Sequence, residues 1–240
     1  MFGLRPIELS PRLTALAQQV PENARFADIG TDHARLPVWL LEHGVISRAI
    51  AADLRSGPLD RARETARRHN VSERISFRFG DGLQPIQPDE ADVIAIAGMG
   101  GETISDILLA APWVAERDIL LLLQPMTSAP KLREWLSGHC FRICGERLVQ
   151  EEENLYVILT VRPGRMPELS RAELWAGCQE RGMEEPLRGD YLALMIGRVK
   201  HAADGLRRST RIEDAARLAE QATLLRELEH MKEEWDTWQM

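Results

Sequence analysis

The chain of 240 residues is poor in cysteine, and its three cysteines are Cys140, Cys144 and Cys178. They are odd in number and form no C-x-x-C pair, so we expect neither a zinc knuckle nor a disulfide framework. We expect all three to be small residues in or near a core. With no H-E-x-x-H motif and no cluster of His and Cys residues, the sequence predicts no metal site.

Long apolar segments are also missing. No apolar run approaches the roughly 20 residues that cross a bilayer, and residues 1–10 lack the pattern of a signal peptide. We therefore expect a cytoplasmic protein with no membrane partner. Apolar residues still make up 44% of the chain, which is enough for one large domain or one domain with an appendage.

An excess of positive charge is absent, because 30 Lys and Arg residues face 37 Asp and Glu residues, giving a net charge of −7. This argues mildly against a nucleic-acid partner, which normally meets a basic surface. The basic residues are clustered, however. One patch contains Arg61, Arg63, Arg67 and Arg68, and a second contains Arg198, Lys200, Arg207 and Arg208. Each patch is either a nucleic-acid contact or an ordinary solvated helix face.

Strand-like apolar runs alternate with amphipathic helical patterns through the first part of the chain. Strands are predicted at 26–29, 48–52, 75–79, 91–97 and 119–123, and helices at 9–20, 36–43, 58–69, 103–109 and 131–136. This alternation predicts an α/β fold with a parallel sheet. Two extended runs, 141–149 and 155–161, then follow with only a short link, so they should pair antiparallel at a sheet edge.

A linker is predicted around Pro163, Gly164 and Pro167. Beyond it, apolar residues recur at helical spacing in two segments, which predicts a coiled-coil-like helical hairpin. We therefore expect two domains, residues 1–164 and residues 165–240.

The clearest signal of a site is the turn A-D-I-G-T-D-H-A at residues 27–34, after the first predicted strand. Ligands of open parallel sheets bind outside the carboxyl ends of the strands, and Gly30 allows the backbone to approach a ligand closely. The full G-x-G-x-x-G fingerprint is absent, and the turn carries Asp28 and Asp32 instead. Carboxylates repel a pyrophosphate but suit the cationic S-adenosylmethionine. A plain strand-to-helix turn is the alternative.

Acidic residues also follow the next two predicted strands. Asp53 ends the second strand, where a carboxylate accepts hydrogen bonds from ribose hydroxyls. Asp81 and Gly82 follow the third strand, where the acid would receive an adenine amino group. Each acid is alternatively a helix cap, but together they indicate a rim that binds a nucleoside.

Two further segments follow the fourth and fifth strands. The segment G-M-G-G at 98–101 is too rich in glycine for a regular element, so we expect it to break the strand and pass close to a ligand. It replaces the N-P-P-Y or D-P-P-Y motif of many enzymes that methylate amino groups. Gln124 could bind a purine edge or satisfy loop backbone, and the sequence leaves both open.

Four segments together are typical of one family: A-D-I-G-T-D-H-A-R-L-P (27–37), A-A-D-L-R-S-G-P-L (51–59), A-G-M-G-G (97–101) and L-Q-P-M (123–126). On these motifs the chain resembles the bacterial tRNA (adenine-22-N1)-methyltransferases. The resemblance extends through L-R-E-W-L (132–136) and both hairpins, so it covers nearly the whole chain. It implies a seven-stranded Rossmann-like methyltransferase core, S-adenosylmethionine as cofactor, and N1 of an adenine in tRNA as target.

Roles for individual residues follow from the motifs and the resemblance. Cofactor contacts are predicted for Asp28, Gly30, Thr31, Asp53, Asp81, Gly82, Gly98, Met99 and Gly100. The predicted catalytic residues are Asp32, His33 and Gln124. Asp32 is the first choice for stabilising the positive charge of the methylated adenine, and His33 is expected to order the loop. Both basic patches are candidate tRNA contacts, as is the whole C-terminal appendage.

Three rival functions are a small-molecule methyltransferase, a nucleotide-binding oxidoreductase and a non-catalytic protein whose helical hairpin binds a partner. The arginine-rich segment argues against the first, and the broken glycine fingerprint argues against the second. Binding of the cofactor without methyl transfer would favour the third. A monomer is the favoured oligomeric state.

Overall fold

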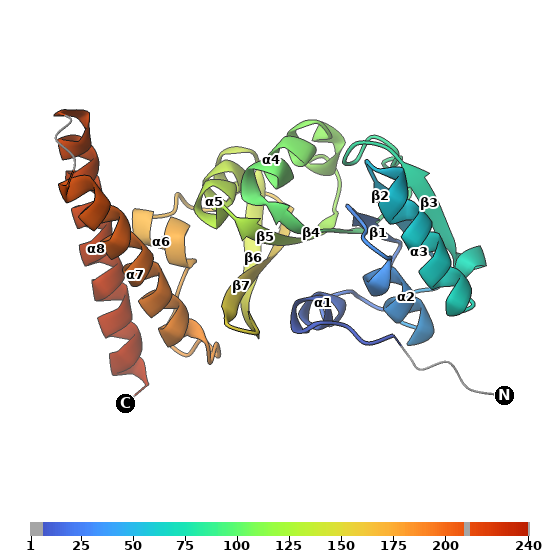
Figure 1. Cartoon of the computed structure of the whole chain (residues 1–240), viewed down its shortest axis with the longest axis horizontal. Helices are drawn as coiled ribbons and strands as arrows, with labels where there is room; N and C mark the ends of the chain where they lie inside the picture. Colours follow the sequence, from blue (N-terminus) through green and yellow to red (C-terminus); the bar gives the residue numbers. More distant parts are fainter. Residues whose placement is uncertain (1–6, 209–211, 240) are drawn as a thin grey trace. The chain divides into compact units, whose positions relative to one another are not determined.

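The computed structural model describes residues 7–208 and 212–239. In this part of the chain, one sheet has the strand order β3-β2-β1-β4-β5-β7-β6, which confirms the predicted α/β fold (Figure 1). The strands are β1 (Phe26–Ile29), β2 (Ala49–Asp53), β3 (Ile75–Phe79), β4 (Val93–Gly100), β5 (Leu120–Thr127), β6 (Phe141–Glu151) and β7 (Asn154–Pro163). The first five strands pair in parallel, and β7 pairs antiparallel with both β5 and β6.

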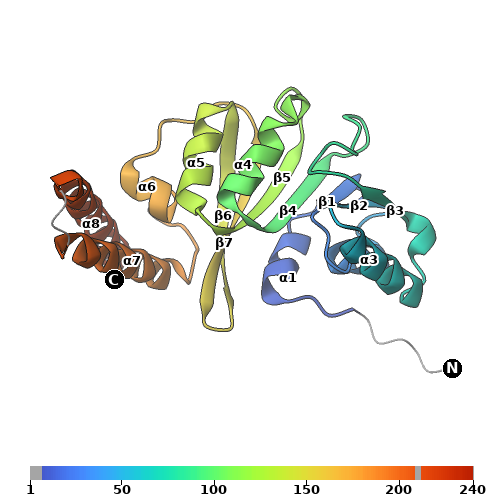
Figure 2. The ribbon, with the colours of Figure 1, turned by 45° about the horizontal axis from the view of Figure 1, so that its top comes forward.

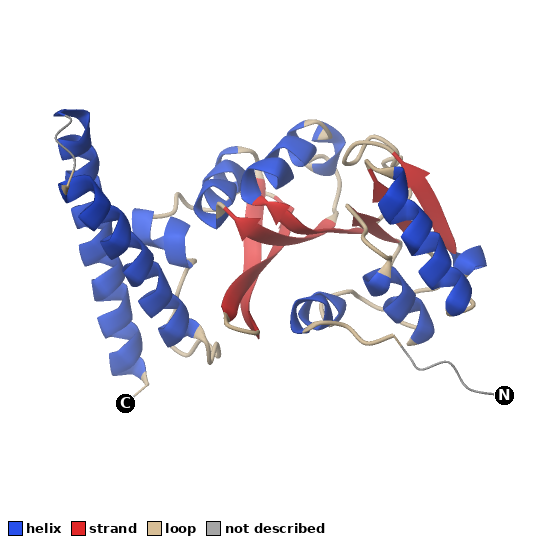
Figure 3. Cartoon of the chain, in the orientation of Figure 1, coloured by secondary structure: helices blue, strands red, loops and turns tan. Residues whose placement is uncertain are grey.

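Helices cover both faces of the sheet (Figures 2 and 3). The helices α1 (Pro11–Ala17), α2 (Arg35–Glu42) and α3 (Ser56–Arg68) share one hydrophobic cluster with the sheet. The helices α4 (Gly101–Leu109) and α5 (Ala129–Gly138) pack together against β4, β5 and β6. Every residue of β1 and β2 is buried, as expected for parallel strands with both faces covered.

The glycine-rich end of β4 differs from the expectation. The prediction that the strand breaks at Gly98 is wrong, because β4 continues to Gly100 through two shifts of register against β5. Gly98 has a φ of +77°, which glycine adopts without a steric penalty. Such bulges re-aim a strand next to a site. The glycines therefore bend the strand rather than end it.

The chain folds as two compact units, Met1–Met166 and Pro167–Met240. The second unit contains α6 (Arg171–Ala176), α7 (Arg188–Arg207) and α8 (Ile212–Trp238). A capping box between Ser170 and Glu173 begins α6. The buried Arg188 donates hydrogen bonds to the carbonyl groups of Ala176 and Gly177, and so ties the end of α6 to α7.

All three cysteines are exposed, so the expectation that they lie in or near a core is wrong. Cys140 occupies the turn before β6 with a φ of +60°, and Cys144 lies beside a register shift in β6. Because β6 is the edge strand of the sheet, one of its long sides is not covered by a neighbouring strand.

Two further properties hold for the residues that the structure describes. None of the helices in this part combines the length and the apolar character needed to cross a membrane. Among the same residues, no three His, Cys, Asp or Glu side chains are grouped so that they could hold a metal ion.

Candidate functional site

A cavity of about 790 Å³ lies in the first unit at the carboxyl ends of β1, β2, β4 and β5. Its volume is within the range of small-molecule and cofactor sites. The lining includes nine residues singled out from the sequence, namely Asp28, Gly30, Asp32, His33, Asp53, Arg61, Gly98, Met99 and Gln124. It also includes seven residues to which the sequence analysis gave no individual role in the site, namely Ser10, Arg12, Leu13, Arg35, Leu36, Arg55 and Ala97.

The turn between β1 and α2 is held in an unusual backbone conformation. Gly30, His33 and Ala34 all have positive φ, at +74°, +62° and +49°. Strain at non-glycine residues is common in functional sites. The N–H groups of Gly30 and Thr31 donate to the carbonyl of Ala52 at 2.8 and 3.0 Å, which fastens the turn to β2.

Gly30 is favoured by its positive φ, and it also makes a close contact with Met99. A Cβ atom at this position would lie 1.9 Å from Cε of Met99, on the bulged end of β4. The Met99 methyl group therefore rests on the Gly30 backbone, and the two residues together shape one wall of the cavity.

Two buried carboxylates come from neighbouring strands. Burial raises the pKa of Asp28 on β1 to about 6, and the charge of Asp53 on β2 acts in the same direction. Asp53 is 6% exposed, and its Oδ1 accepts the backbone N–H of Arg55 at 2.8 Å. A cationic group near this pair would relieve the cost of burying two negative charges.

Asp32 and His33 lie on the more exposed side of the cavity. Oδ1 of Asp32 accepts hydrogen bonds from Nη2 and Nε of Arg61, at 2.8 and 3.3 Å. Nε2 of His33 is 3.7 Å from the same oxygen. Arg61, which the sequence suggested as a tRNA contact, thus joins the site itself.

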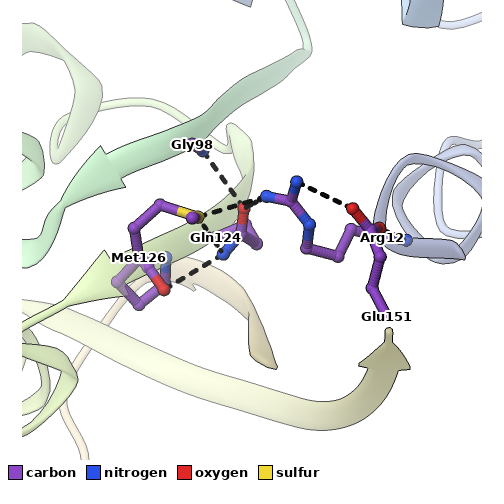
Figure 4. Close-up of polar contacts among 6 residues, drawn as sticks. Arg12, Gly98, Gln124, Met126 and Glu151 are labelled. Atoms are coloured by element: carbon purple, nitrogen blue, oxygen red, sulfur yellow. Dashed lines mark hydrogen bonds and ion pairs between the residues drawn. The ribbon is translucent and has the colours of Figure 1, made fainter. Parts of the chain in front are cut away.

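Gln124 is almost completely buried at the end of β5 and is held by its neighbours (Figure 4). Its Oε1 accepts the N–H of Gly98 and a hydrogen bond from Nη1 of Arg12, each at 3.1 Å. Its Nε2 donates to the carbonyl of Pro125 at 3.0 Å. Gln124 thus satisfies backbone groups of β4 and β5 and also lines the cavity, so its binding of a purine edge stays a prediction.

Arg12 was missed by the sequence analysis, because a single arginine in the first turn of a helix carries no distinctive pattern. It enters the cavity from α1, although its main partners lie more than 100 residues away in the sequence. Only the folded sheet brings these residues together.

Four predicted cofactor residues do not line the cavity. Thr31 is 1% exposed, and its side chain acts on the neighbouring Asp28, partly opposing the rise in pKa that burial causes. Gly82 has a φ of +52°, and a Cβ there would lie 3.0 Å from Ile107 of α4, so the backbone conformation and the packing both disfavour a side chain. Asp81 precedes it in the loop after β3, and Gly100 forms the N-cap of α4.

Most of the arginines in the first basic patch pair with acids of their own helix. On α3, Arg63 pairs with Asp60, and both Arg67 and Arg68 pair with Glu64. This is the arrangement of a solvated helix face.

The second patch, on α7, is mixed. Lys200 pairs with Glu229 and Arg207 with Asp204. Arg198 and Arg208 are exposed.

Comparison with known proteins gives a consistent result. Residues 9–159 match the family model described as a methyltransferase domain. The tRNA (adenine(22)-N(1))-methyltransferase of Bacillus subtilis is 37% identical over 161 residues, which are 67% of this chain and 68% of that protein.

The fold is also that of solved relatives. Bacillus subtilis TrmK, an m1A22 tRNA methyltransferase, superposes with a TM-score of 0.81 at 27% identity and covers 94% of this chain and 99% of its own. Streptococcus pneumoniae Sp1610, solved in complex with S-adenosyl-L-methionine, gives 0.79 at 30% identity, covering 92% of this chain and 99% of its own.

The strand order, the cavity at the strand ends and these similarities agree with one another. The chain belongs to the methyltransferase domain family, and within it to the family of the Bacillus subtilis tRNA (adenine(22)-N(1))-methyltransferase.

Proposed function

We propose that this chain transfers a methyl group from S-adenosylmethionine to N1 of an adenine in tRNA, at position 22. The observation that carries the proposal is the cavity, which combines two buried carboxylates, a strained turn and a bulged glycine-rich strand in a chain of this family. We infer a role in tRNA modification, and with it a cytoplasmic location.

The residues at the β1 and β2 ends fit the cofactor. S-adenosylmethionine, when bound, supplies an electrophilic methyl group on a sulfonium centre. The buried carboxylates of Asp28 and Asp53 suit its ammonium and ribose hydroxyl groups, and the Gly30 turn leaves room for close backbone approach. Thr31 does not line the cavity, and we propose that it acts indirectly, through its contact with Asp28.

The reaction at adenine needs little acid–base chemistry. N1 has a free lone pair, so no strong base is required, and the chain must chiefly turn the base out, orient it and exclude water. The methylated adenine is a cation. We assign Asp32 to stabilising that charge, because it is an exposed carboxylate in the cavity, and His33 to ordering the turn around it.

We propose the surface that binds tRNA from the positions of the positively charged side chains. Arg61 reaches the cavity, and Arg63, Arg67 and Arg68 continue along α3. The second unit offers Arg198, Lys200, Arg207 and Arg208, and we propose that it assists tRNA binding. Because several of these side chains already pair with acids, phosphates must compete with those pairs.

The direct test is to incubate the protein with labelled S-adenosylmethionine and unmodified tRNA, then digest the tRNA and identify the nucleosides. Labelled 1-methyladenosine, lost when the target adenine is replaced by guanine, is the expected result. Tight cofactor binding with no label in any tRNA would reject the proposal in favour of a small-molecule or non-catalytic function.

A further inference from the structure

Arg12 is held in one orientation by residues from two strands (Figure 4). Its Nη1 donates to Oε1 of Gln124 and to Sδ of Met126, both at 3.1 Å. Its Nη2 donates to Oε1 of Glu151 at 3.0 Å, and its backbone N–H donates to the other Glu151 oxygen at 3.1 Å. Contacts with both terminal nitrogens therefore fix the plane of the guanidinium group.

One face of this guanidinium rests on an aromatic ring. Cζ of Arg12 lies 4.6 Å from the centroid of the Tyr156 ring on β7. Arg12 lines the cavity, whereas Tyr156, Met126 and Glu151 are not among the described residues that line it. Because both terminal nitrogens are engaged and one face rests on Tyr156, we take the opposite face to be the part presented to the cavity.

This face lies on the β5 side of the cavity. Asp28 and Asp53, to which we assign the cofactor, come from β1 and β2, whereas the main cavity-lining partner of Arg12, Gln124, comes from β5. In the sheet, β4 separates β1 from β5. Arg12 therefore borders the part of the cavity left for the substrate.

The chemistry of a turned-out base suits such a surface. Proteins that recognise unstacked RNA bases stack them on aromatic rings or on arginine planes. A guanidinium that is already immobilised loses little entropy when a base stacks on it. Its ion pair with Glu151 also compensates its charge, so a methylated adenine does not meet an unpaired cation.

We propose that the cavity-facing side of the Arg12 guanidinium is the platform on which the target adenine stacks. The inference rests on the proposed function and adds a substrate-binding residue to it. Glu151, Gln124 and Tyr156 then act as positioning residues, because they hold the platform flat.

The test compares two tRNAs, one with the target adenine and one with an abasic nucleotide in its place, in the presence of S-adenosylhomocysteine. Arg12→Lys keeps a positive charge beside Glu151 but removes the planar face. It should raise Kd for the adenine form by about fivefold or more relative to the abasic form, since base stacking is the interaction lost. Tyr156→Leu removes the ring that supports the guanidinium. It should also raise Kd for the adenine form relative to the abasic form, but by a smaller factor.

A matched control is available on the same interface. Arg147 on β6 donates to Gln18, next to α1, at 2.9 Å and does not line the cavity. Arg147→Lys should leave both Kd values, and their ratio, unchanged. Affinity for S-adenosylmethionine should be close to wild type in all three variants, measured below their melting temperatures.

Two results would overturn the proposal that Arg12 stacks on the target adenine. If Arg12→Lys weakens both tRNAs equally, Arg12 binds backbone or supports structure and does not contact the base. If Arg12→Lys does not fold, an unchanged ratio in Tyr156→Leu rejects the proposal. The binding ratio requires no turnover, so failure of the wild-type protein to form 1-methyladenosine would count against the proposed function alone.

Discussion

Arg61 of α3 donates two hydrogen bonds to one oxygen of Asp32, at 2.8 and 3.3 Å, and thereby joins α3 to the turn after β1. Both side chains are about half exposed, at 48% and 62%. Exposed ion pairs add little to stability. The pair therefore matters chiefly because it sets the position of the carboxylate that we assign to the adenine.

Asp32→Ala should lower kcat about a hundredfold and leave the affinity for S-adenosylmethionine nearly unchanged. The physical reason is that the carboxylate acts on charge that develops only as N1 is methylated. Single-turnover rates and calorimetric titration of the cofactor measure the two quantities. Loss of cofactor affinity with an unchanged rate would reject the role of Asp32.

Arg61→Gln should weaken tRNA binding and reduce its dependence on salt concentration by about one counterion, as expected for a lost phosphate contact. Arg25→Gln is the matched control, because Arg25 is an exposed arginine that pairs with Asp92, lies outside both basic patches and does not line the cavity. The effect of Arg61→Gln should be the larger of the two. Equal salt slopes in wild type, Arg61→Gln and a charge-reversed α3 would show that tRNA binds elsewhere.

Asp53→Ala should weaken binding of S-adenosylmethionine by about ten- to a hundredfold, which corresponds to losing hydrogen bonds to a charged acceptor. Asp92→Ala is a suitable control, since Asp92 pairs with Arg25 just before β4 and does not line the cavity. Isothermal calorimetry at a fixed pH measures both variants. An unchanged affinity in Asp53→Ala would remove this residue from the cofactor site.

The ionisation of Asp28 should make stability depend on pH. Burial raises its pKa from an ordinary 3.8 to about 6, so the folded chain binds this proton more tightly than the unfolded chain. The contribution of Asp28 to the free energy of unfolding therefore falls as the pH rises from about 4 to about 6, by about 3 kcal/mol.

Asp28→Asn removes this titration. Without cofactor, the variant should be more stable than wild type above pH 6, and the difference should disappear near pH 4. It should also bind the cationic cofactor more weakly at neutral pH. Chemical denaturation at several pH values measures the difference, and a variant less stable than wild type at pH 7.5 contradicts the prediction.

Gly30→Ala tests the contact with Met99. Gly44 has a similar φ, +68° against +74°, but open space around it, so Gly44→Ala measures the backbone strain alone. Each variant should lose about 1–2 kcal/mol of stability. Only Gly30→Ala should also weaken cofactor binding, because the new methyl group displaces the Met99 side chain within the cavity. Equal cofactor affinities in the two variants would contradict this.

The architecture and the acids at the strand ends could be predicted from the sequence alone. The predicted bounds 26–29 and 75–79 match β1 and β3 at both ends. β1 is buried throughout, as expected for a parallel strand inside the sheet. β3 lies at the edge of the sheet and is buried only at Ile75, and its alternating sequence marked it. Because parallel strands place their carboxyl ends at one edge, the order of elements is enough to bring Asp28 and Asp53 together. A glycine in a turn likewise predicts a positive φ, and Gly30 has a φ of +74°.

The partners of individual side chains, in contrast, depend on the folded chain. Arg12 contacts Glu151 across 139 residues of sequence, and Arg61 pairs with Asp32 whereas Arg63 pairs within its own helix. The bulge that carries β4 through Gly98 depends on its pairing with β5. Such partners depend on which side chains the folded chain places next to each other. They leave no periodic pattern in the sequence from which they could be predicted.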